Sequence, residues 1–151
     1  MTRLAFSKAS LHKEGAQLKR YQQYLPSLDL KRQQLMAERR KALQQLADTE
    51  EKIKQCSLCV EQQLPMLSDL QIDLMDLVSI KQAFISEENV VGIKLPFLKK
   101  IDLQRESYSL LTKPHWVDFL VVKLEEMLEL QVRFKVNQQR VEVLQQAVKK
   151  V

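Results

Sequence analysis

The sequence is poor in glycine and proline, the residues that most often interrupt helices and close turns. Its 151 residues include only 2 glycines and 4 prolines, against average shares of about 7% and 5%. So few breakers argue against a fold of many short elements joined by tight turns. Together with 28% charged and 45% hydrophobic residues, they favour a small number of long helices.

The sequence also has few of the residues from which active sites are built. Its two glycines, Gly15 and Gly92, lie too far apart to form a phosphate-binding loop. His12 and His115 are equally distant, and adjacent acids such as Glu125 and Glu126 suit exposed positions rather than a shared pocket. We therefore predict no catalytic residue, no cofactor and no metal ion.

Signals for membrane insertion or export are not found either. No apolar run approaches the ~18 residues of a transmembrane helix. The first residues, Met1 to His12, lack the continuous apolar region of a secretory signal. With two cysteines, this favours a reducing compartment.

Cys56 and Cys59 form the one motif with possible metal or redox chemistry, a Cys-x-x-Cys. A zinc site needs four ligands, and neither a second such pair nor a nearby histidine is present in the sequence. A thioredoxin-type motif needs a βαβ setting, which the pattern lacks. We expect two small residues on a helix, with metal or redox work as the weaker alternative.

The last third of the chain carries a heptad repeat. One row of its seam reads Leu120, Met127, Phe134, Val141 and Val148, and the other reads Lys123, Leu130, Asn137, Leu144 and Val151. Such a seam predicts a helix over 114–151 that pairs with another helix, starting with Pro114 at its first position after a cap at Thr112 or Lys113. Asn137 either fixes the register of the pair or lies in solvent.

The partner helix is predicted at 7–63, starting near Ser7 or Ser10. Its first apolar stripe is Leu11, Leu18, Tyr21, Leu25 and Leu28. The stripe stays in phase across Pro26, which therefore predicts a kink and not an end. Two further rows, Leu28–Leu35–Ala42 and Leu46–Ile53–Val60, indicate a phase shift between Ala42 and Leu46.

The stretch 64–113 changes period and predicts a small β-containing head at one end of the helix pair. Val78 to Ile85 alternates as a strand, and Ser86 to Asn89 suits a turn. Val90 to Leu95, around Gly92, and Phe97 to Leu103 are further extended pieces. The predicted fold class is mainly α: one elongated domain, 1–151, in which a long antiparallel two-helix coiled coil carries a β-hairpin-containing head in the middle of the chain.

The net charge of +5 permits anionic partners without requiring them. The basic residues of the first helix are Lys31, Arg32, Arg39, Arg40 and Lys41. We expect a solvated helix face, with a basic binding stripe as the alternative. Aromatic residues are not interleaved with them, so we do not predict a nucleic-acid partner.

Three stretches resemble the D subunit of V-type (V/A-type) ATPases and ATP synthases, in its chlamydia-like bacterial branch. Glu88 to Pro96 is similar to the family's segment in the middle of the chain, with Asn89, Gly92 and Pro96 as its motif residues. The segment before the family's last helix is similar to Ser107 to Asp118, and part of its first helix is similar to Tyr24 to Lys31. The family's last helix runs further than Val151, so the resemblance implies a truncated chain.

The resemblance implies a non-catalytic rotor shaft in the central stalk, whose rotation couples ATP hydrolysis or synthesis to ion translocation. Implied partners are the catalytic and regulatory subunits of the ATPase ring, a small central-stalk subunit and the socket subunit of the membrane rotor. The implied location is the cytoplasmic side of a membrane, touched only through the complex. Arg32, Arg39, Arg40 and Lys41 would meet acidic surfaces in the ring. The alternative is a generic coiled-coil scaffold or adaptor.

Overall fold

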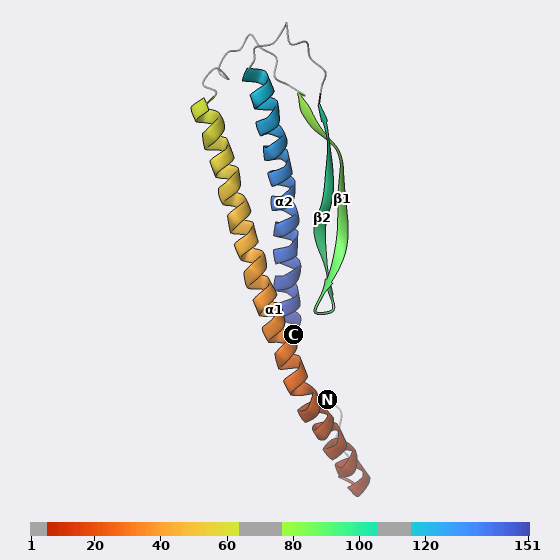
Figure 1. The fold of residues 1–151 in the computed structure, drawn as a ribbon. Helices are drawn as coiled ribbons and strands as arrows, with labels where there is room; N and C mark the ends of the chain where they lie inside the picture. The colour runs from red at the N-terminus through yellow and green to blue at the C-terminus, as the bar shows by residue number, and fades with distance from the viewer. Residues whose placement is uncertain (1–5, 64–76, 106–115) are drawn as a thin grey trace.

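Two long antiparallel helices and one long β-hairpin make up the computed structural model, which describes residues 6–63, 77–105 and 116–151. The elements are α1 (Lys8–Gln63), β1 (Val78–Val90), β2 (Ile93–Arg105) and α2 (Trp116–Lys150). Figure 1 shows α1 and α2 side by side, with the hairpin along α2 on the side away from α1. The predicted fold class is confirmed.

Helix α1 begins at Lys8 with Ser7 as its cap. The Ser7 hydroxyl accepts a hydrogen bond of 3.1 Å from the amide of Ser10, and the Ser7 carbonyl accepts one of 3.0 Å from the amide of Leu11. These bonds satisfy amides that a helix start leaves unpaired. The helix continues through Pro26 over 56 residues, about 84 Å at ~1.5 Å per residue, so Pro26 is not a helix end, as predicted.

The phase shift predicted near Ala42 is wrong. The buried residues of α1 are Leu35, Ala42, Thr49 and Cys56, an unbroken row of sevens. The half-buried row Leu46, Ile53 and Val60 begins three residues before Thr49, which is the spacing between the two rows of one heptad seam. A threonine and a cysteine occupy apolar positions here, and hydrophobicity alone did not identify them as members of the seam.

The hairpin turn lies at Val91 and Gly92, and not at Ser86 to Asn89 as predicted. Those four residues belong to β1 and pair with β2. Val91 and Gly92 have φ values of 53° and 80°, as required by the primed turn that suits a two-residue hairpin. Asparagine is the usual residue at the first position, and a β-branched valine is strained there. The local turn signal at Ser86 to Asn89 is therefore misleading.

The hairpin contains two compensating β-bulges. Between Ile80 and Gln82 the strand β1 has an extra residue, Lys81, and opposite Phe84 and Ile85 the strand β2 has an extra residue, Lys99. Each bulge shifts the pairing by one, so the two cancel and both ends of the hairpin keep the same register.

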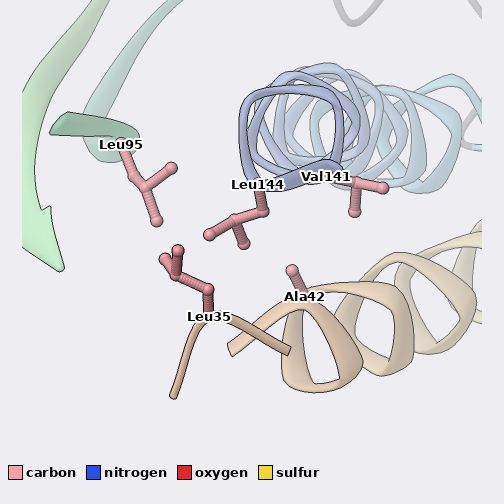
Figure 2. Close-up of a cluster of buried hydrophobic side chains, with 5 residues drawn as sticks. All are labelled: Leu35, Ala42, Leu95, Val141 and Leu144. Carbon is pink, nitrogen blue, oxygen red and sulfur yellow. The ribbon is translucent and has the colours of Figure 1, made fainter. Parts of the chain in front are cut away.

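The hairpin lies along the helix pair and does not cap one end of it, which corrects the predicted position of the head. Thirteen residues per strand span about 44 Å, close to the ~52 Å of α2. The two hydrophobic clusters lie toward opposite ends of this contact. Near the hairpin tip, Leu35, Leu95 and Leu144 point toward one another from three elements (Figure 2). Near its base, Leu77 packs with Val117, Leu120 and Val121.

Some predictions fall outside the described residues. These are the cap at Thr112 or Lys113, Pro114 at the first position of the last helix, the position of His115, and the assignment of residues 64–76. At the start of α2, Val117 and Val121 are buried.

Candidate functional site

The seam between α1 and α2 is the first candidate for a functional surface. Of its predicted residues, Leu120, Val141 and Leu144 are buried, and Met127, Leu130, Phe134, Asn137 and Val148 are half-buried. Val141 and Leu144 share a cluster with Leu35 and Ala42 of α1 (Figure 2). The seam of α2 is thus in contact with the heptad row of α1.

A polar layer interrupts this apolar seam. Asn137 of α2 donates from Nδ2 to the hydroxyl of Thr49 on α1, at 3.2 Å. The same hydroxyl donates to the carbonyl of Gln45 at 2.7 Å, so its donor and acceptor capacities are both used. Sliding one helix by a heptad would break the Asn137–Thr49 bond and leave the amide facing apolar side chains. Of the two roles predicted for Asn137, this geometry favours fixing the register.

Arg140 connects α2 to both strands near the hairpin tip. Its Nη1 lies 3.3 Å from Oε2 of Glu88 on β1 and 3.2 Å from the carbonyl oxygen of Pro96 on β2. Only 15% of the Arg140 side chain is exposed, against 53% for Glu88. Its Nε is buried without a hydrogen-bond partner among the described residues. We call this set of contacts the Arg140 latch.

The latch gives the motif Asn89, Gly92 and Pro96 a structural context. Gly92 adopts the positive φ of the turn, Asn89 pairs with Lys94 across the hairpin, and Pro96 offers its carbonyl to Arg140. Proline lacks an amide for the ladder, and a two-stranded sheet tolerates it because each strand pairs on one side only. The segment thus shapes the tip that contacts the helix pair.

A second ionic contact fastens the base of the hairpin. Arg105, at the end of β2, donates from Nε and Nη2 to the two carboxylate oxygens of Glu125 on α2, the Nη2 bond being 2.6 Å. The bond to Arg105 lowers the pKa of Glu125 because it stabilises the charged carboxylate. The hairpin is therefore held to α2 by an arginine at each end. Neither contact follows a local sequence spacing, and sequence reasoning missed both.

Between these fastenings, a hollow of about 520 Å³ lies where α1, α2 and the hairpin meet. Its charged lining includes Asp48, Lys52, Glu88, Arg133 and Arg140. Both signs of charge are interleaved, and Arg140 and Glu88 already bind each other. The lining therefore offers no charge of a single sign that would select a ligand.

The cysteine pair lies at the helix–helix contact. Cys56 is buried, Cys59 is half-buried, and Sγ of Cys56 lies 3.9 Å from the carbonyl oxygen of Lys123. Burial, and then the nearby Glu126 carboxylate, raise the pKa of Cys56, which disfavours the reactive thiolate. In the described ranges, no group of three or more His, Cys, Asp or Glu side chains is arranged to hold a metal ion.

The predicted row of solvated basic residues is only partly present. Arg32, Arg40 and Lys41 are exposed, and Lys41 pairs with Glu38 at 3.0 Å. Lys31 and Arg39 are half-buried, and Nε of Arg39 is shielded from solvent. This corrects the expectation for both residues; Arg39 lies seven residues before Leu46 and so belongs to the seam.

Among the described residues, neither helix has a stretch long and apolar enough to cross a membrane. The sequence matches the family of the ATP synthase D subunit over residues 10–151. It is similar to the V-type ATP synthase D subunit of Chlamydia pneumoniae, with 28% identity over 150 residues, covering 96% of this chain and 70% of that protein. The same subunit of Borreliella burgdorferi is 26% identical over 152 residues, covering 95% and 71%. The chain belongs to the ATP synthase D-subunit family.

Proposed function

We propose that this chain is the non-catalytic rotor shaft in the central stalk of a V-type ATPase or ATP synthase. Its rotation would couple ATP hydrolysis or synthesis to ion translocation. The proposal rests on membership of the D-subunit family and above all on one observation. The two long helices are joined by the Asn137–Thr49 hydrogen bond, and a hairpin is fastened along them at both ends.

Stiffness is the first property that a shaft requires. An isolated helix bends easily, whereas two helices packed along a common seam resist bending and relative sliding. The polar layer strengthens the resistance to sliding, because displacement would leave Asn137 unpaired. The clusters around Leu144 and Val121 add apolar contact toward both ends of the hairpin.

Asymmetry is the second property. A ring of subunits can respond to the angle of a shaft only if the faces of the shaft differ. The hairpin covers one side of α2 (Figure 1), and α1 occupies the other. In this proposal the hairpin side is the surface that distinguishes one orientation of the rod from the next.

The proposed partners are the catalytic and regulatory subunits of the ATPase ring, the small central-stalk subunit and the socket subunit of the membrane rotor. We propose a peripheral location on the cytoplasmic side of the membrane, with the membrane reached only through the complex. The exposed cations of Arg32, Arg40 and Lys41 would face acidic surfaces of the ring. Charge reversal at these three positions should weaken coupling, and unchanged coupling would contradict this contact.

The test is reconstitution with the other subunits of the same complex. Adding the chain should allow ATP hydrolysis to drive rotation of a bead attached to the stalk, and omitting it should abolish rotation. The variant Asn137→Asp, which introduces a charge into the polar layer, should lower coupling without removing the ATPase activity of the ring. Failure of the chain to join a complex with ring subunits would refute the proposal and favour a scaffold.

A further inference from the structure

The two cysteines of α1 lie on one side of the helix and share one hollow. Cys56 and Cys59 are both free thiols, and they are three residues apart in the sequence. Residues at this spacing in a helix are neighbours on the same face. Both line a hollow of about 400 Å³ between α1 and α2. The hollow thus holds two thiols that can react with the same reagent.

The helical backbone brings the two cysteines close enough for a disulfide bond. The Cα atoms of residues three apart in an α-helix are separated by about 5 Å. Disulfides join residues whose Cα atoms lie about 4.4–6.8 Å apart. Because both side chains of the pair lie on one face, rotation of the side chains is enough to bring the two sulfur atoms together.

A lysine beside the pair favours thiol chemistry over metal binding. Lys123 of α2 lines the same hollow, and its Nζ donates to Oε2 of Glu126 at 3.0 Å. This hydrogen bond is the main cause of the raised pKa of Lys123, and negative charge on either cysteine also raises it. The ammonium is therefore within electrostatic range of both sulfur atoms. A positive charge here repels a metal cation, whereas it attracts a thiolate, which is the form that attacks disulfides.

The two thiols differ in their access to a reagent. Cys59 is half-buried, so a small molecule in the hollow can reach it. Cys56 is 8% exposed, and its Sγ lies 3.9 Å from the carbonyl oxygen of Lys123. Burial, and then the Glu126 carboxylate, raise the pKa of Cys56. Cys59 is thus suited to attack an external disulfide, and Cys56 to attack a sulfur atom that is already held beside it.

We propose that Cys56 and Cys59 form a reversible thiol-modification site, which a small disulfide such as oxidised glutathione converts into a disulfide bond within α1. Cys59 is the attacking thiol and Cys56 is the resolving thiol. Closing the bond loosens the contact of α1 with α2 at this level of the seam. The proposal does not depend on the role of the chain as a shaft.

The reaction has two exchange steps. The Cys59 thiolate attacks one sulfur of oxidised glutathione, so that a mixed disulfide forms and one glutathione leaves. The Cys56 thiolate then attacks Sγ of Cys59, and the second glutathione leaves. Each departing glutathione takes up the proton that the attacking cysteine has lost. In total, two cysteine thiols are oxidised and one glutathione disulfide is reduced to two thiols.

Closing the bond changes a residue of the helix–helix seam. Cys56 is the last residue of the buried heptad row that starts at Leu35. In the disulfide its sulfur has no proton to donate to the carbonyl of Lys123, and the sulfur is turned along α1 toward Cys59. The contact between the helices is therefore weakened near Lys123. The effect is small and local, because a thiol is a weak donor.

The first test follows the reaction of the full chain with oxidised glutathione by mass spectrometry of acid-quenched samples. The unchanged chain should end as a disulfide within one molecule, lacking two hydrogens and carrying no glutathione. Cys56→Ala should keep glutathione on Cys59, and Cys59→Ala should react at least tenfold more slowly. An unchanged chain that keeps its glutathione, or that becomes linked to a second copy, would overturn the proposal.

A matched control moves the attacking thiol to another face and leaves Cys56 in place. It is the double variant Leu58→Cys with Cys59→Ala. Position 58 is exposed, at 54% for Leu58, and residues two apart in a helix do not face each other. This variant should take up glutathione as readily as the unchanged chain and should keep it. Closure at the rate of the unchanged chain would show that the shared face is not needed, and would refute the proposed site.

The second test measures the effect on the helix pair. Amide hydrogen exchange in α2 around Lys123 should be at least twofold faster in the disulfide form than in the dithiol form. Amides around Leu144, farther along the same seam, should exchange equally in both forms, and reduction with dithiothreitol should restore the slow exchange near Lys123. Equal exchange near Lys123 in the two forms would overturn the proposed loosening of the seam.

Discussion

Removing the Arg140 latch should free the hairpin tip while changing the overall stability very little. The perturbation is Arg140→Met, which keeps the apolar stem and removes the guanidinium. Its Nη1 binds Glu88 and the carbonyl of Pro96, and its Nε is buried without a partner among the described residues. Removing the guanidinium therefore removes two favourable contacts and also one unfavourable buried polar atom.

The magnitudes nearly cancel. The ion pair with Glu88, which is 53% exposed, contributes about 0.5 kcal/mol. The hydrogen bond from a charged group to the Pro96 carbonyl contributes about 1.5–3 kcal/mol. Removing the buried, unpaired Nε returns about 1–3 kcal/mol. The free energy of unfolding should thus fall by less than about 1 kcal/mol at the middle of these ranges, and by no more than about 2.5 kcal/mol at their extremes.

A second variant separates the polar head from the stem. Arg140→Ala has the same polar losses and also removes the two methylene groups beyond Cβ, at ~0.8 kcal/mol each. It should be about 2 kcal/mol less stable than Arg140→Met. Urea denaturation followed by circular dichroism measures both values.

Amide hydrogen exchange tests the local effect. In Arg140→Met, exchange should accelerate for residues near the tip, such as Asn89 and Lys94, and remain slow at the hairpin base near Arg105. The matched control is Arg133→Met, which breaks an ion pair with Glu129 on the same helix and leaves the hydrogen bonds and ion pairs of the described hairpin residues unchanged. Uniform acceleration along the hairpin, or a loss above about 3 kcal/mol in Arg140→Met, would refute this reasoning.

Three further predictions concern the turn, the hairpin base and the cysteines. Gly92→Ala places a side chain at a φ of 80° and should cost about 1–2 kcal/mol in urea denaturation, whereas an equal stability would contradict the observed turn. Glu125→Gln should cost about 0.5–1 kcal/mol at pH 7. Because Arg105 lowers the pKa of Glu125, this contribution is present above pH ~4.3 and is lost as the pH falls through the lowered pKa, so the two proteins should be equally stable at low pH. An alkylating reagent should modify Cys59 before Cys56, because Cys56 is buried and its pKa is raised. Mass spectrometry of the digested protein measures the order of modification, and earlier modification of Cys56 would contradict this prediction.

The long helices could be predicted because their signal is local and repeated. Apolar residues at spacings of three and four specify a helix and its buried face, and Ser7 supplied a recognisable cap. The same signal failed at Thr49 and Cys56, where the seam uses side chains that a hydrophobic pattern does not count. The false phase shift near Ala42 was predicted because Thr49 and Cys56 were not counted as seam residues.

The position of the hairpin could not be predicted because it depends on contacts between distant residues. Arg140 meets Glu88 and Pro96 across separations of 52 and 44 residues, which no local pattern encodes. The position of the turn was predicted wrongly for a different reason. Val91 occupies a backbone conformation that usually calls for asparagine or glycine, and its side chain packs against the cluster around Leu35 and Leu95. Tertiary packing overrides the local preference at this residue.

The two bulges have a consequence for how copies of the chain behave at high concentration. In the part of the chain that the structure describes, the sheet has two strands, and β1 is long and carries exposed Ile80, Phe84 and Ile85. A flat edge of this kind is a template for adding strands from other molecules, which leads to fibres. Lys81 bulges from this strand next to its apolar residues, and it disrupts the edge with both a twist and a charge. We therefore expect the bulge at Lys81 to disfavour the addition of further strands along β1.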